Sequence, residues 1–140
     1  MGDDPLSRLP HGLSFRFIDR ILEMIPGERV VALKNVTVDD PNLQGHFPGD
    51  PLMPGVLLVE AMAQTAGLLL PEGSSAVLAQ IKKARFRRPV VPGDQVRIEA
   101  VRIMALGGLH RFQVKASVSG GPVAEGEIVL AITAPADGSS

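Results

Sequence analysis

The chain has no cysteine, tryptophan or tyrosine, and its charge shows no excess of either sign. Its 140 residues carry 14 Lys and Arg against 15 Asp and Glu, a formal net charge of −1. The absence of cysteine excludes disulfides, thiolate nucleophiles and thiolate zinc sites. The balanced charge removes the nonspecific attraction on which nucleic-acid binding depends, so we expect no nucleic-acid partner. Any chemistry must use His, Asp, Glu, Ser, Lys or backbone groups.

The length and composition are those of one folded domain. With 45% hydrophobic and 21% charged residues, the chain lies well away from the compositions typical of disorder. We expect a single domain over residues 1–140, in which about 134–140 form a flexible tail. The first ten residues include two aspartates and lack the apolar core of a signal peptide, so we expect a cytoplasmic location.

One long apolar run, residues 52–70, approaches the ~20 residues that a bilayer-spanning helix needs. Glu60 lies in its middle, and inserting a carboxylate there would cost about 2.5 to 3.5 kcal/mol. We therefore predict a helix that is enclosed by protein and not embedded in a membrane. Proline is favoured at the first position of a helix and breaks its interior, so we expect the helix to begin near Pro54 and end before Pro71.

The rest of the chain has the alternation of apolar and polar residues that is typical of strands. The predicted strands are Arg29–Val38, Ala76–Phe86, Gln95–Met104, Arg111–Ser119 and Val123–Ile132. Tight glycine turns join the last three into an antiparallel meander. A helix that is apolar on nearly all sides must be covered, so we predict an α+β fold in which a curved antiparallel sheet wraps a central helix. A second copy of the chain is expected to cover the remaining side.

The helix carries a candidate catalytic acid. Glu60 and Gln64 are four residues apart and share one helix face. An apolar setting favours the protonated form of a carboxyl group, as in enzymes that hold a carboxylic acid ready to donate a proton. The alternative is that Glu60 caps a neighbouring loop or reaches solvent at an interface.

A candidate catalytic base lies just before the helix. The run Gly45–Gly55 contains three prolines and three glycines, which fix the path of the backbone. His46 in this run is placed to act as a general base, because imidazole is mostly neutral at pH 7. Its alternative role is a hydrogen bond that holds the loop. The Gly55 amide at the helix N-terminus can bind an oxyanion. The set favours proton abstraction next to a carbonyl, followed by loss of a leaving group.

Long motifs then give a family resemblance. The run GHFPGDPLMPG (45–55), continued by VLLVEAMAQTAG (56–67), resembles the signature of the FabZ-type 3-hydroxyacyl-acyl-carrier-protein dehydratases of type II fatty acid biosynthesis. The stretch RFRRPVVPGDQVRIE (85–99) and the segments LPH and VALKNVT resemble the same family. The resemblance covers nearly the whole chain.

The resemblance implies a hot-dog fold and a homodimer, or a trimer of dimers, with a shared active site. His46 of one subunit would lie beside Glu60 of the other, Gly55 would bind the thioester carbonyl, and Gln64 would support them. The implied reaction converts (3R)-3-hydroxyacyl-acyl-carrier-protein to the trans-2-enoyl product and needs no metal or redox cofactor. The substrate is carried on the phosphopantetheine arm of acyl carrier protein, and Phe47 and Phe86 are expected to line the acyl tunnel.

Two departures from the family pattern bear on the reaction. The family commonly has a tyrosine that is proposed to gate the tunnel, and this chain has none. The aspartate at position 50 makes the motif resemble that of the bifunctional dehydratase-isomerases. Those enzymes, however, carry Asp where this chain has Glu60. The sequence therefore favours a simple dehydratase.

Other functions remain open. A hot-dog acyl thioesterase or an enoyl-thioester hydratase is one alternative, although the hydratase motif places Asp five residues before the His and this chain has Pro41 there. A non-catalytic acyl-binding subunit is another, although a binding tunnel alone needs neither His46 nor Glu60.

A basic segment, KKARFRR, is the last feature that points to a partner. Its five cations are Lys82, Lys83, Arg85, Arg87 and Arg88. In the resemblance, this segment would receive the acidic carrier protein or the phosphate of its phosphopantetheine arm. The alternative is a solvated face of a strand. His11 and His110 are interpreted as structural.

Overall fold

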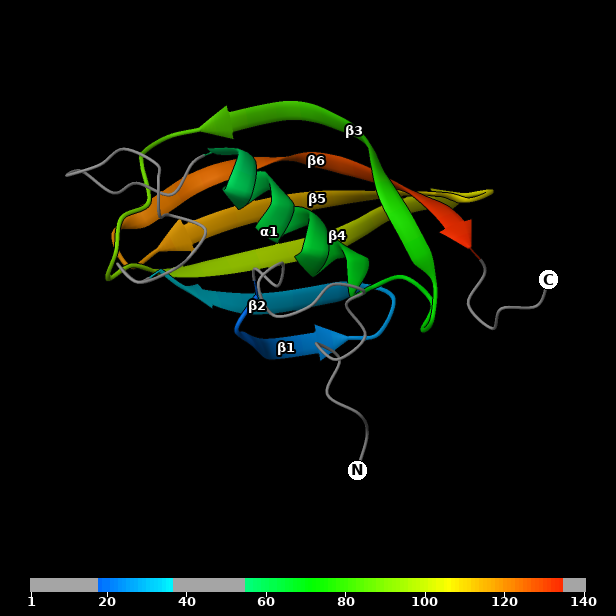
Figure 1. Cartoon of the computed structure of the whole chain (residues 1–140), viewed down its shortest axis with the longest axis horizontal. Helices are drawn as coiled ribbons and strands as arrows, with labels where there is room; N and C mark the ends of the chain where they lie inside the picture. The colour runs from blue at the N-terminus through cyan, green and yellow to red at the C-terminus, as the bar shows by residue number, and fades with distance from the viewer. Residues whose placement is uncertain (1–17, 37–54, 135–140) are drawn as a thin grey trace.

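The computed structural model describes residues 18–36 and 55–134, which form one antiparallel sheet of six strands with one helix packed against it (Figure 1). The sheet order is β1-β2-β4-β5-β6-β3. The α+β prediction of a sheet wrapped around a helix is confirmed. In chain order the elements are β1 Arg20–Ile25, β2 Arg29–Asn35, α1 Gly55–Gly67, β3 Ser75–Phe86, β4 Gln95–Leu106, β5 Leu109–Val118 and β6 Gly121–Ala134.

The predicted meander is formed by β4, β5 and β6. On β5 the buried residues alternate with more exposed ones, so that His110, Phe112, Val114, Ala116 and Val118 face the helix. Gly107 has φ +61° in the turn that joins β4 to β5, a conformation that glycine adopts without steric cost. The alternation of apolar and polar residues in the sequence therefore predicts which side chains of β5 enter the core.

Strand β1 was not predicted. Its sequence, RILEMI, does not alternate cleanly, and its pairing with β2 shifts between Ile21 and Glu23. A bulge of this kind places successive residues out of phase with the partner strand. The bulge explains why apolar and polar residues do not alternate regularly in the β1 sequence.

Helix α1 is shorter than the apolar run. It ends at Gly67, and the chain then tightens through hydrogen bonds from the Leu68, Leu69 and Leu70 amides to carbonyls three residues earlier, at 3.1, 3.0 and 3.2 Å. Three-residue hydrogen bonds of this type commonly close the last turn of a helix. The helix therefore stops before Pro71, as expected.

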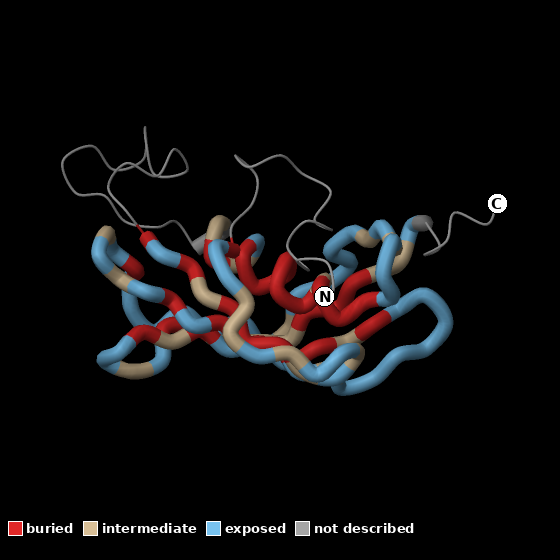
Figure 2. Tube along the Cα trace, turned by 90° about the horizontal axis from the view of Figure 1, so that it is seen from below, coloured by how far each residue is buried: buried red, intermediate tan, exposed pale blue. Residues whose placement is uncertain are grey.

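The core lies between α1 and the concave face of the sheet. Leu58, Ala61 and Ala66 of the helix pack in one cluster with Ile98 and Phe112 of the sheet. Figure 2 shows the buried segments in the interior and the exposed ones at the periphery. One side of the helix is left uncovered by the sheet.

Strand β3 is an edge strand of twelve residues, hydrogen-bonded to β6 on one side. Most of its side chains are exposed, including four large apolar ones: Val77 (54%), Leu78 (39%), Ile81 (41%) and Phe86 (51%). A long, apolar and unpaired edge is uncommon in monomeric proteins, because it offers a template for another strand. This edge runs alongside the uncovered side of α1 (Figure 1).

Candidate active site

Glu60 lies in the middle of α1 and is exposed in the single chain. The interpretation of this residue as a buried carboxyl is therefore wrong for one copy. The residues that follow it in the helix, 61–66, are all buried, so Glu60 differs from its neighbours. The alternative in which Glu60 reaches the surface describes the isolated chain.

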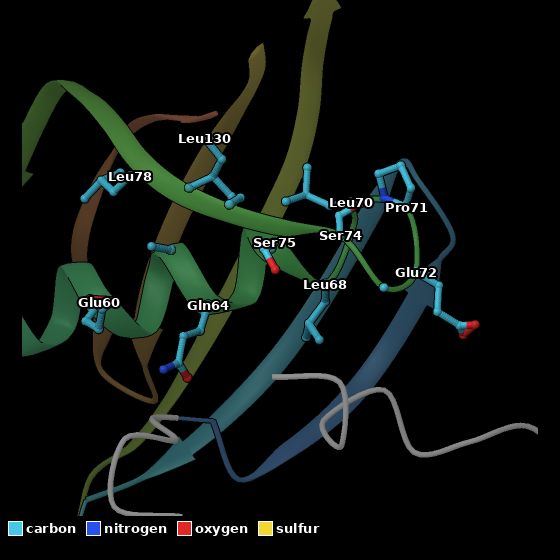
Figure 3. Close-up of a pocket in the computed structure, with 14 residues that line it drawn as sticks. Glu60, Gln64, Leu68, Leu70, Pro71, Glu72, Ser74, Ser75, Leu78 and Leu130 are labelled. Atoms are coloured by element: carbon cyan, nitrogen blue, oxygen red, sulfur yellow. The ribbon is translucent and has the colours of Figure 1, made fainter. Parts of the chain in front are cut away.

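Gln64 follows Glu60 by one helical turn, and it is buried at 8% exposure. Both residues line one cavity of about 140 Å³ between α1 and the start of β3. Figure 3 shows the two side chains on successive turns of α1. The helix thus brings the two predicted polar residues to the same site, as their spacing of four indicated.

The other walls of this cavity combine apolar side chains with the polar residues Glu72, Ser74 and Ser75. Leu78 comes from β3 and Leu130 from β6 (Figure 3), and these two residues face each other in the strand register. The small residues Ala63 and Gly67 form part of the helix wall. A carboxyl beside the apolar wall formed by Leu78 and Leu130 is suited to a ligand that has a reactive polar end and a hydrocarbon chain.

The far end of the groove is the turn between α1 and β3. It is formed by Leu70, Pro71 and Ser74, where the Ser74 amide donates to the Pro71 carbonyl at 3.0 Å. The Ser74 hydroxyl is buried and has no hydrogen-bond partner among the described residues. This end wall was not predicted, because nothing in the sequence relates the turn to Glu60.

The predicted base, His46, and the predicted tunnel residue Phe47 lie outside the described residues. Gly55 is the first residue of α1. The first amides of a helix have no partner within it, and the role of Gly55 as an oxyanion donor stays a prediction.

Phe86, the other predicted tunnel residue, is exposed at the end of β3 and does not line this cavity. It pairs with Ala124 of β6. Its role in lining a tunnel stays a prediction. Such a tunnel would need a second copy packed on β3 to complete its wall.

Part of the basic segment is already engaged within the chain. Arg87 Nη2 lies 2.7 Å from a Glu125 carboxylate oxygen, and Lys83 Nζ lies 3.9 Å from Glu127. The hydrogen bond and the charge of Arg87, with smaller contributions from Arg85 and Lys115, hold the pKa of Glu125 below its usual range. Lys82, Arg85 and Arg88 form no ion pair with any residue that the structure describes.

Neither a metal site nor a membrane span is found in the described ranges. No three His, Asp or Glu side chains within 18–36 and 55–134 are grouped to hold a metal ion. The same part of the chain has no helix that would cross a bilayer.

Sequence comparison links the chain to one group of enzymes. A family model described as the FabA-like domain matches residues 9–131. The 3-hydroxyacyl-[acyl-carrier-protein] dehydratase FabZ of Acetivibrio thermocellus is 50% identical over 129 residues, which are 89% of this chain and 88% of the relative. FabZ of Geobacter metallireducens is 46% identical over 127 residues, 86% and 85% of the two chains.

Solved structures share the fold at low sequence identity. The dehydratase heterocomplex ApeI:P from Xenorhabdus doucetiae has a TM-score of 0.78 at 18% identity, over 91% of this chain and 90% of that chain. The E. coli PaaI protein from the phenylacetic acid degradation operon has a TM-score of 0.67 at 20% identity, over 85% and 81%. The expected hot-dog fold is confirmed.

Proposed function

We propose a mechanism for this chain, which belongs to the FabA-like family as a FabZ-type 3-hydroxyacyl-[acyl-carrier-protein] dehydratase. Such an enzyme removes water from a 3-hydroxyacyl thioester in fatty acid biosynthesis. We assign it the (3R)-hydroxy substrate and the trans-2-enoyl product. The observation that carries the mechanism is the position of Glu60 at one end of the groove between α1 and β3.

The elimination needs one base, one acid and one oxyanion donor. His46 takes the proton from C2, and the electron pair of that bond forms the C2–C3 double bond. Protonated Glu60 donates to the C3 hydroxyl, which leaves as water. The Gly55 amide binds the thioester oxygen as negative charge develops on it, and Gln64 supports Glu60 from the next turn.

A second copy of the chain completes this site. Because β3 is an apolar edge strand, two copies can pair these strands about a two-fold axis and continue one sheet across both. The partner would then cover the side of α1 that carries Glu60. Removal from water favours the neutral form of a carboxyl group, which is the form that the acid step requires. We propose that the partner also supplies His46.

No metal or redox cofactor takes part in this mechanism, since every proton transfer is assigned to a side chain. The substrate arrives on the phosphopantetheine arm of acyl carrier protein. The basic segment Lys82–Arg88 is proposed to receive this acidic partner, with Lys82, Arg85 and Arg88 as the cations that lack an ion pair within the described chain. Assembly beyond the dimer and a cytoplasmic location stay predictions.

The test is to follow enoyl-thioester formation from 3-hydroxyacyl-acyl-carrier-protein. Removing a general acid or base typically lowers the rate by about 10² to 10⁴, so we expect His46→Ala and Glu60→Gln each to lose activity on this scale. Undiminished turnover in either variant contradicts its assigned role. Release of free thiol without enoyl product would identify a thioesterase instead, and bound acyl chain without conversion would identify a binding subunit.

A further inference from the structure

Helix α1 contains a glycine whose presence the fold does not explain. Gly67 is the last residue of the helix, and glycine is among the least favourable residues in a helix. Five other described glycines have φ between +61° and +129°, but Gly67 is not among them. Its backbone conformation is therefore one that alanine also adopts.

Close packing does not require this glycine either. A Cβ placed on Gly67 would meet no atom within 4 Å. At Gly126, by contrast, a Cβ would lie 3.2 Å from the Ala84 Cα, so the neighbouring strand excludes a side chain there. The space beside Gly67 is open in the single chain.

That open space belongs to the groove that starts at Glu60. Gly67 lines the same cavity, and positions 60, 64 and 67 recur at the spacing that keeps residues on one helix face. Seven residues at a rise of 1.5 Å place Gly67 about 10 Å along the axis from Glu60. The end wall at Leu70, Pro71 and Ser74 lies beyond it.

We propose that Gly67 is a specificity-determining residue, whose missing side chain keeps the groove open to long acyl chains. The inference rests on the proposed function, which places C2 and C3 of the substrate at Glu60. With C–C bonds of about 1.5 Å, a hydroxybutyryl group ends far short of Gly67, whereas a hydroxypalmitoyl chain extends past it. A side chain at position 67 therefore obstructs long substrates and leaves short ones unobstructed.

The test compares 3-hydroxybutyryl- and 3-hydroxypalmitoyl-acyl-carrier-protein as substrates of the wild type, Gly67→Ala and Gly67→Leu. The quantity measured is the ratio of kcat/KM for the long substrate to kcat/KM for the short one. We expect this ratio to fall at least tenfold in Gly67→Leu and by less in Gly67→Ala. Because alanine favours the helix, Gly67→Ala should also unfold at a temperature no lower than the wild type.

The control is Ala105→Leu, which adds bulk at an exposed position of β4 outside the cavity. It should leave the ratio unchanged. Equal losses on both substrates, or dissociation into monomers, would contradict the inference, because Gly67 would then serve packing between copies. An unchanged ratio in Gly67→Leu would also overturn it. A wild type inactive on both substrates would refute the proposed function itself.

Discussion

The guanidinium of Arg102 holds the turn that follows α1: Nη2 donates to the Leu69 carbonyl at 2.7 Å. The same guanidinium lies over the Phe112 ring, 5.9 Å from its centroid. This contact ties the helix end, and with it the end wall of the groove, to strand β4. A hydrogen bond from a charged donor is stronger than one between neutral groups, so Arg102 holds this turn firmly.

Arg102→Ala should lower the free energy of unfolding by about 1.5 to 3 kcal/mol, the range for hydrogen bonds to charged groups. Urea denaturation measures this change. Arg97→Ala is the matched control, because its ion pair with Glu23 at 3.2 Å is exposed, and exposed ion pairs contribute little to stability. Equal losses in the two variants would contradict the stabilising role of the Arg102 hydrogen bond.

His110 should make stability depend on pH. Burial, and then the charge of Arg102, lower the pKa of this imidazole from its usual value of 6.5. Its Nδ1 is buried without a hydrogen-bond partner among the described residues, and its ring stacks on Phe112. The unfolded chain therefore binds a proton at His110 more readily than the folded chain does. Stability is fully present above pH 6.5 and falls as the pH drops below it.

His110→Leu should remove this part of the pH dependence. The stability of the variant relative to wild type should therefore rise as the pH is lowered from 7.5 to 5.5. Denaturation midpoints at a series of pH values measure the difference. His11 and His46 are present in both proteins, so their contributions cancel. A constant difference across the range would show that His110 does not resist protonation in the folded state.

The edge of β3 should hold the two copies together. Ile81→Lys places a charge on this edge, and we expect sedimentation to show monomers together with a loss of dehydration activity. Ile103→Lys introduces the same change at a similarly exposed position of β4, 46% against 41%, and should leave the dimer intact. A dimer that persists in Ile81→Lys would place the interface elsewhere.

Carrier-protein recognition should depend on the basic segment. Arg85→Ala and Arg88→Ala should raise KM for an acyl-carrier-protein substrate, with little effect on kcat, because they change encounter and not chemistry. The effect should shrink at high salt, as exposed charges are screened. Arg97→Ala, on another strand, serves as the control. If neither variant changes KM, these side chains do not bind the carrier protein and form only a solvent-exposed face of the strand.

The sequence predicted the sheet better than it predicted the surroundings of Glu60. Alternation on β5 identifies its buried face because each residue is read against its neighbours two positions away. The exposure of Glu60 depends instead on which side of α1 the sheet covers. An apolar helix sequence does not contain that information.

Gly67 shows a related limit. The motif that ends with this residue indicated the family, but it gave no reason for the glycine. The reason we infer requires the empty space beside the helix, and that space depends on how the neighbouring elements pack around α1. His46 could be singled out from the prolines and glycines around it in the sequence, whereas its proposed pairing with Glu60 of a second copy could not be predicted from one chain.

Complementation between two inactive variants tests the shared site most directly. Subunits of His46→Ala and Glu60→Gln are mixed and allowed to exchange, heterodimers are confirmed by native mass spectrometry, and enoyl-thioester formation is measured. If His46 of one copy works with Glu60 of the other, each heterodimer regains one intact site, and random exchange restores about a quarter of wild-type activity. Heterodimers that form without any recovery would place both residues in the same subunit's site and contradict the account.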